Sequence, residues 1–175
     1  TASISGDNSV CDGGSVTFTA SGGTTYLWSQ GGLTTPGITV TDNTTRIVTV
    51  TDANGCTDTA EKTLVVHTNP TASISGDNSV CQGGSVTFTA SGGTTYLWST
   101  GSLTTPVITV SNNTPVTVTV TDANGCTDTA EKTLLVHSNP TATISGDNSV
   151  CDGGSVTFTA SGGNTYVWST GPGTP

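Results

Sequence analysis

Positive charge, aromatic side chains and long apolar runs are all scarce in this 175-residue sequence. Three Lys and Arg residues stand against twelve Asp and Glu residues, which gives a net charge of -9. Because such a surface repels phosphate backbones, the composition disfavours nucleic-acid binding. No apolar run approaches the roughly 18 residues that a membrane-spanning helix needs, so we expect no membrane span in this segment and place any export signal or anchor outside it.

A helical pattern is missing as well. Hydrophobic residues make up 31% of the chain and aromatic residues 5%, while Thr, Ser, Gly and Val dominate. This composition is typical of short strands joined by tight turns, and no segment has the spacing of an amphipathic helix. The sequence therefore predicts an all-β protein.

What the chain does have is a 70-residue repeat. Residues 1–70 return as residues 71–140 with 11 differences, and a third copy occupies 141–175 and stops in mid-repeat. Seventy residues can support a small self-contained domain, so we expect two immunoglobulin-like repeats and a partial third, which is truncated or completed by strands from elsewhere. Asn69-Pro70 joins the repeats without a Gly/Ser spacer, which favours a short, stiff joint and an extended rod.

Alternation and turn residues predict the strands of one repeat. Val16, Phe18 and Ala20 share one strand face, and Asn54-Gly55 is typical of a tight turn. Six or seven short strands in 70 residues make a compact β-sandwich. The expected strands of the first repeat are 2–5, 15–20, 25–29, 38–41, 47–51 and 56–67.

The five cysteines occupy two positions of the repeat: Cys11, Cys81 and Cys151 share the first, and Cys56 and Cys126 share the second. No zinc-binding spacing accompanies them, so we expect disulfides and an oxidising, extracellular or cell-surface location. We favour a bond within each repeat, from Cys11 to Cys56. The alternative is a bond between repeats, because a standard seven-strand sandwich would place Cys11 nearer to Cys126 than to Cys56.

The recurring aromatic residues have two interpretations. Trp28, Trp98 and Trp168 recur at one position, each preceded two residues earlier by a Tyr. We predict that these Trp side chains fill the cores. If the rings were exposed instead, a row of them along the rod could stack against glycans.

No constellation in the sequence predicts catalysis or a cofactor. The turn containing Asp52, Asn54 and Asp58 has oxygen ligands, but Asp and Asn are common turn formers and the bidentate Glu of a calcium loop is missing, so we assign no metal site. His67 and His137 lie at strand ends without a nucleophile elbow or a paired carboxylate. We expect a chain that is not an enzyme.

Three segments together resemble a known family: Ser-Val-Cys-x-Gly-Gly-Ser-Val-Thr-Phe-Thr-Ala-Ser-Gly-Gly (9–23), Tyr-Leu-Trp-Ser (26–29) and Val-Thr-Val-Thr-Asp-Ala-Asn-Gly-Cys (48–56). They are similar to the PKD-like, immunoglobulin-like repeats of large Bacteroidota surface proteins, including gliding-motility adhesins. The resemblance covers both complete repeats. It implies β-sandwich repeats, type IX secretion and a role in adhesion, motility or extracellular structure. It also implies O-glycosylation at Asp-Thr-Ala, which would place sugars on Thr59 and Thr129; otherwise these are plain solvent-facing threonines.

Three functions agree with these observations. The first is a structural stalk or filament of a secreted or surface adhesin, which could self-associate into an extracellular fibre through Thr/Val-rich strand edges. Its expected partners are other copies of itself or the neighbouring repeats of a longer chain. The second is a module that binds surface glycans. The third is a spacer in a secreted polymer-degrading enzyme.

Overall fold

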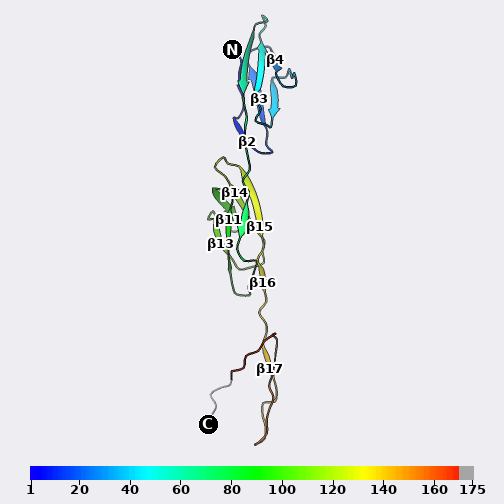
Figure 1. The fold of residues 1–175 in the computed structure, drawn as a ribbon, viewed down its shortest axis with the longest axis vertical. Coiled ribbons are helices and arrows are strands. Elements are labelled where there is room, and N and C mark those ends of the chain that lie inside the picture. The colour runs from blue at the N-terminus through cyan, green and yellow to red at the C-terminus, as the bar shows by residue number, and fades with distance from the viewer. Residues whose placement is uncertain (170–175) are drawn as a thin grey trace.

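The computed structural model describes residues 1–169, which form β-strands joined by turns and contain no helix. Three units follow one another along one long axis, and the first strands of the chain lie in the unit at one end (Figure 1). Each of the first two units is a β-sandwich of eight short strands. The predicted architecture, an all-β array of immunoglobulin-like repeats in an extended rod, is confirmed.

The strands recur in the same order in both complete repeats. In the first repeat they are β1 (Ser3–Ser5), β2 (Ser9–Cys11), β3 (Val16–Ser21), β4 (Thr25–Trp28), β5 (Gly37–Val40), β6 (Arg46–Thr51), β7 (Thr57–Lys62) and β8 (Val65–His67). In the second they are β9 (Ser73–Ser75), β10 (Ser79–Cys81), β11 (Val86–Ser91), β12 (Thr95–Trp98), β13 (Val107–Val110), β14 (Val116–Thr121), β15 (Thr127–Lys132) and β16 (Leu135–His137). The partial third unit contains β17 (Thr143–Ser145) and β18 (Thr159–Ser161).

Two antiparallel sheets and one parallel strand pair build each complete repeat. In the first repeat the sheets have the orders β1-β3-β5 and β4-β6-β7. The short strand β2 pairs in parallel with β8, with Cys11 opposite His67. The second repeat has the same pairings, so the strand pattern follows from the repeated sequence.

The core lies between the sheets, where the alternating strands turn their apolar side chains inward. Phe18 and Trp28 are the largest buried side chains of the first core, with 0% and 1% exposure, and Phe88 and Trp98 have the same values in the second. The indole N–H of Trp28 donates a hydrogen bond of 2.9 Å to the carbonyl of Thr35, so its polar atom is satisfied inside the repeat. Burial of each such ring stabilises the fold by about 1.5–3 kcal/mol.

The strand pattern differs from the prediction in two places: β2 lies outside every expected strand, and the last expected strand is interrupted. The expected strand 56–67 is divided into β7, which pairs with β6, and β8, which pairs with β2. The chain changes sheets at Thr63-Leu64, where the fully buried Leu64 enters the core. No Gly or Pro marks this crossing, and the sequence pattern therefore missed it.

The connection between β4 and β5 decides the topology. β4 pairs antiparallel with β6, and β5 pairs antiparallel with β3. β4 and β5 both run toward the same end of the repeat, so the chain must cross the repeat between them. Residues 29–36 make this return without forming a strand; the carbonyls of Leu33 and Pro36 accept hydrogen bonds from the N–H groups of Trp28 and Ala20. The repeat therefore has seven axial traverses, as in a standard immunoglobulin-like sandwich.

Candidate functional site

The contact between the first and second repeats is the candidate site. It is built from the end of one repeat and the start of the next, both defined by backbone hydrogen bonds. Within residues 1–169 no group of three or more His, Cys, Asp or Glu side chains could hold a metal ion. The chemistry at this junction is that of a pair of cysteines.

The first cysteine lies at the C-terminal end of the first repeat. The pairing of β2 with β8 holds Cys11 beside His67, the last residue of β8. The N–H of Asp12 then donates to the carbonyl of His67 at 2.7 Å, and the N–H of Gly14 donates to the carbonyl of Cys11 at 2.9 Å. These bonds fix the corner after β2, and with it the direction of the Cys11 side chain.

The second cysteine follows the turn between β14 and β15, at the N-terminal end of the second repeat. One carboxylate oxygen of Asp122 accepts the N–H groups of Asn124 at 2.9 Å and Cys126 at 2.8 Å. Gly125 has φ of 84°, a conformation that favours glycine. The Asp-Ala-Asn-Gly sequence thus forms the tight turn that it predicts.

A disulfide connects the two repeats at this point. Cys11 is bonded to Cys126, with Cα atoms 5.5 Å apart and a sequence separation of 115. The favoured pairing of Cys11 with Cys56 is therefore wrong for this repeat. The first of the seven traverses ends at Cys11 and the last begins at Cys56, so these two cysteines lie at opposite ends of the repeat. Cys126 lies across the junction from Cys11.

The other three cysteines have free, exposed thiols, contrary to the expectation that all five form disulfides: Cys56, Cys81 and Cys151. None of the three has another cysteine of this sequence 115 residues before or after it, which is the spacing of the Cys11–Cys126 bond.

The residues at the junction are less exposed than the equivalent residues of the other repeat, which shows that the junction covers part of the surface. Cys126 is buried, with 1% exposure, whereas Cys56 at the same position of the first repeat is exposed. His67 is half-buried, whereas His137 is exposed. Beside Cys81, at the end of the second repeat, the surface has an open depression of about 350 Å³ lined by Gln82, Asn113 and Val136, among others. The junction is thus a packed contact between the repeats.

Burial and hydrogen bonds act in opposite directions on Asp122. Burial at the junction raises its pKa, but the N–H groups of Cys126 and Asn124 and the nearby His67 outweigh this effect and hold the pKa below its ordinary value. At the equivalent turn of the first repeat, hydrogen bonds from Cys56 and Asn54 lower the pKa of Asp52. A charged Asp therefore stabilises each turn.

Two further Asp residues hold the start of each repeat. A carboxylate oxygen of Asp58 accepts the N–H of Ala2 at 2.8 Å, and Asp128 accepts that of Ala72 at the same distance. These bonds lower the pKa of both carboxyl groups. The carboxylate groups of Asp52 and Asp58, which were considered as calcium ligands, thus accept hydrogen bonds from backbone N–H groups.

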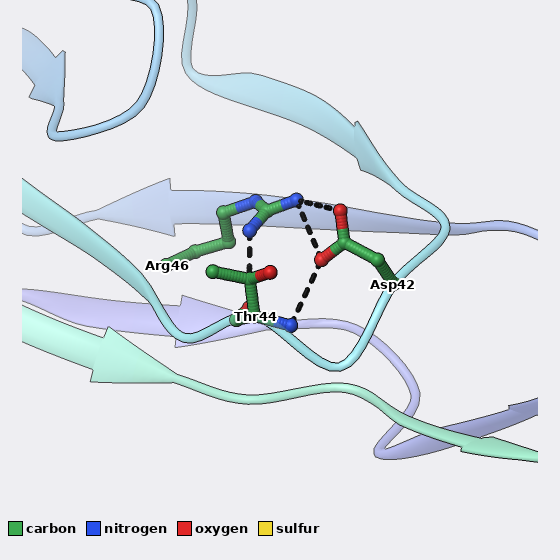
Figure 2. Close-up of polar contacts among 3 residues, drawn as sticks. All are labelled: Asp42, Thr44 and Arg46. Carbon is green, nitrogen blue, oxygen red and sulfur yellow. Dashed lines mark hydrogen bonds and ion pairs between the residues drawn. The ribbon is translucent and has the colours of Figure 1, made fainter.

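A second charged contact lies near the junction in the first repeat only. Figure 2 shows Arg46, which donates to both carboxylate oxygens of Asp42 at 3.0 and 2.9 Å and to the carbonyl of Thr44. The side-chain hydrogen bond from Arg46, followed by those from Thr44, lowers the pKa of Asp42 to about 2. In the second repeat Asn112 and the buried Val116 stand at these positions, so both charges are replaced together.

The remaining predicted residues lie away from the junction. Trp28 and Trp98 are buried, while Trp168 in the partial unit is half exposed. Thr59 in β7 and Thr129 in β15 are exposed. Sequence analysis did not identify Asp42. The simultaneous replacement of residues 42 and 46 in the second copy is the signal that could have identified this ion pair.

The sequence matches no protein-family model and no curated protein. Among solved structures, murine CEACAM1b is 12% identical with a TM-score of 0.36, covering 78% of this chain and 100% of its own. A structure described as giving insight into host cell surface retention of a 1.5-MDa bacterial ice-binding adhesin is 18% identical with a TM-score of 0.39, covering 83% of this chain and 68% of its own. At this level of similarity neither protein assigns a function to the chain.

Proposed function

We propose that this chain is a non-catalytic structural region, a stalk or filament of a secreted or cell-surface bacterial adhesin. The observation that carries the proposal is the covalent junction, in which a disulfide joins two nearly identical repeats arranged end to end. A backbone connection and a disulfide together restrict both bending and rotation at the joint. A rod of fixed direction is suited to holding another part of a protein away from a surface.

The division into repeats at 1–70, 71–140 and 141–175 is part of this proposal. Each of the first two segments contains a buried core of its own, centred on Trp28 and Trp98. The same disulfide then joins two repeats wherever a cysteine equivalent to Cys11 faces one equivalent to Cys126 across a junction.

An extracellular or cell-surface location follows from the same bond, because disulfides persist in oxidising compartments. Residues 1–169 contain no helix that is long and apolar enough to cross a membrane. Export by the type IX route and sugars on Thr59 and Thr129 are finer parts of the proposal. The exposure of both threonines leaves them accessible for modification.

The glycan-binding alternative requires exposed rings along the rod. Trp28 and Trp98 are 1% exposed, and the hydroxyl of Tyr26 donates to the carbonyl of Gly23 within its own repeat. A row of stacking platforms is therefore not formed by the two complete repeats. A spacer role in a secreted enzyme uses the same rod and differs only in what the rest of the protein does.

Electron microscopy of native, unreduced material from the source cells tests the proposal. An antibody against the repeat should label thin filaments or stalks with an axial period of about 40 Å, the length of a 12-residue extended segment. Label confined to soluble protein bound on glycan would refute the structural role.

A further inference from the structure

The disulfide also determines which residues bear a tension applied along the rod. We propose that the Cys11–Cys126 bond is the load path of the array, so that axial tension bypasses both hydrophobic cores. This inference deepens the proposed stalk role, and it rests on the order of the strands along the axis.

The shortest covalent route through the two repeats is short. It follows residues 1–11, crosses the bond, and continues from Cys126 toward Pro140. Residues 12–125 hang from this route as a closed loop. That loop contains every buried residue of the first core and all of the second except Leu134. Among the buried residues of the two cores, tension carried by the route therefore passes only through Leu134.

The route has almost no slack, because its two parts already run along the axis. Strands β1 and β2 cross the first repeat, and the hydrogen bond between Ala2 and Asp58 and the pairing of Cys11 with His67 mark its two ends. Strands β15 and β16 cross the second repeat in the same way. The 24 peptide steps from residue 1 to 11 and from 126 to 140 span about 80 Å when extended. This is close to the length of two repeats, at about 40 Å each.

Without the bond, tension would follow the backbone through both repeats. It would then shear the parallel pair β2–β8, since the N-terminal end of β2 and the C-terminal end of β8 would be pulled apart along their common direction. That pair has three residues in each strand, as does its counterpart β10–β16. Such a small clamp would open first and expose the cores.

The prediction is measurable as a length. The bond withholds from extension the segment between Cys11 and Cys126, whose sequence separation is 115. At about 3.5 Å per residue, this segment corresponds to roughly 400 Å of extended chain.

Single-molecule force spectroscopy on the 175-residue chain, held at its two termini by attachments that do not use cysteine, tests the proposal. The oxidised chain should show no unfolding event from the first two repeats. The Cys11→Ser variant should show two, with a combined gain of about 400 Å. Cys81→Ser, which changes the same position of the second repeat where the thiol is free, should behave as the oxidised chain.

Reduction of the unaltered protein under constant tension guards against a variant that fails to fold. Adding a thiol reductant should release about 400 Å from molecules that were inextensible before. Equal extension before and after reduction would overturn the load path. The stalk role would not fall with it, because that role is decided by microscopy on the source cells.

Discussion

Removal of the disulfide should weaken both repeats and also uncouple them. The perturbation is Cys11→Ser in a chain whose free cysteines are replaced by serine. Cys11 is half-buried, so the serine hydroxyl keeps access to water, whereas a serine at the buried Cys126 would not. Closing a loop across 115 residues restricts the unfolded chain by about 5 kcal/mol in the chain-entropy model.

The location of the bond decides how this free energy is divided. If one repeat unfolds while its neighbour stays folded, the bond still closes a loop of about 60 residues, which costs about 4 kcal/mol. Unfolding the second repeat then adds only about 0.5 kcal/mol. With the bond, the two repeats should therefore unfold in one transition; without it, they should unfold separately.

Urea unfolding followed by tryptophan fluorescence reports both effects, because Trp28 and Trp98 are buried in the two cores. Cys11→Ser should lower the midpoint and reduce the slope of the free energy with urea by about half, since the slope follows the surface exposed in one transition. The matched control, a chain that keeps Cys11 and Cys126 and has serine at the other three positions, should retain both. An unchanged slope in Cys11→Ser would refute the coupling.

Three further predictions concern other positions. Since the pKa of Asp42 is lowered to about 2 from an ordinary 3.8, its contribution to stability is present above pH 3.8 and is lost as the pH falls toward 2; Arg46→Val should return the pKa toward 3.8 in an NMR titration of the Asp42 carboxyl group. Ser102 has φ of 52°, where the first repeat has Gly32, so Ser102→Gly should stabilise the second repeat by about 1 kcal/mol in urea unfolding, and an equal or lower stability would contradict this. Thiol labelling followed by mass spectrometry should count three thiols in the unreduced chain and five after reduction, and a count of one would contradict the pairing described here.

The fold was predictable because most of its determinants are local. The alternation of Val16, Phe18 and Ala20 gives one buried strand face, and Asn54-Gly55 supplies the turn that glycine permits at φ of 83°. The 70-residue repeat predicted the array, because the same strand pattern follows itself along the chain. None of these features needs information about distant residues.

The disulfide could not be decided in the same way, because it depends on how many times the chain crosses the repeat. Residues 29–36 make one crossing with no strand pattern, so a count of strands from sequence omits them. One crossing more or less moves Cys56 from one end of the repeat to the other. The 70-residue period left both pairings open, and only the three-dimensional path selects Cys126.

A bond between repeats, unlike one within them, makes the junction part of the repeating unit. Each 70-residue unit brings one cysteine at the corner after its second strand and one at the turn before its last strands, as Cys81 and Cys126 show. Duplication of the unit therefore adds one new junction bond and leaves the existing bonds in place. Within one repeat the same two cysteines lie too far apart to pair. Neighbouring repeats are therefore linked by a disulfide only when they are arranged end to end.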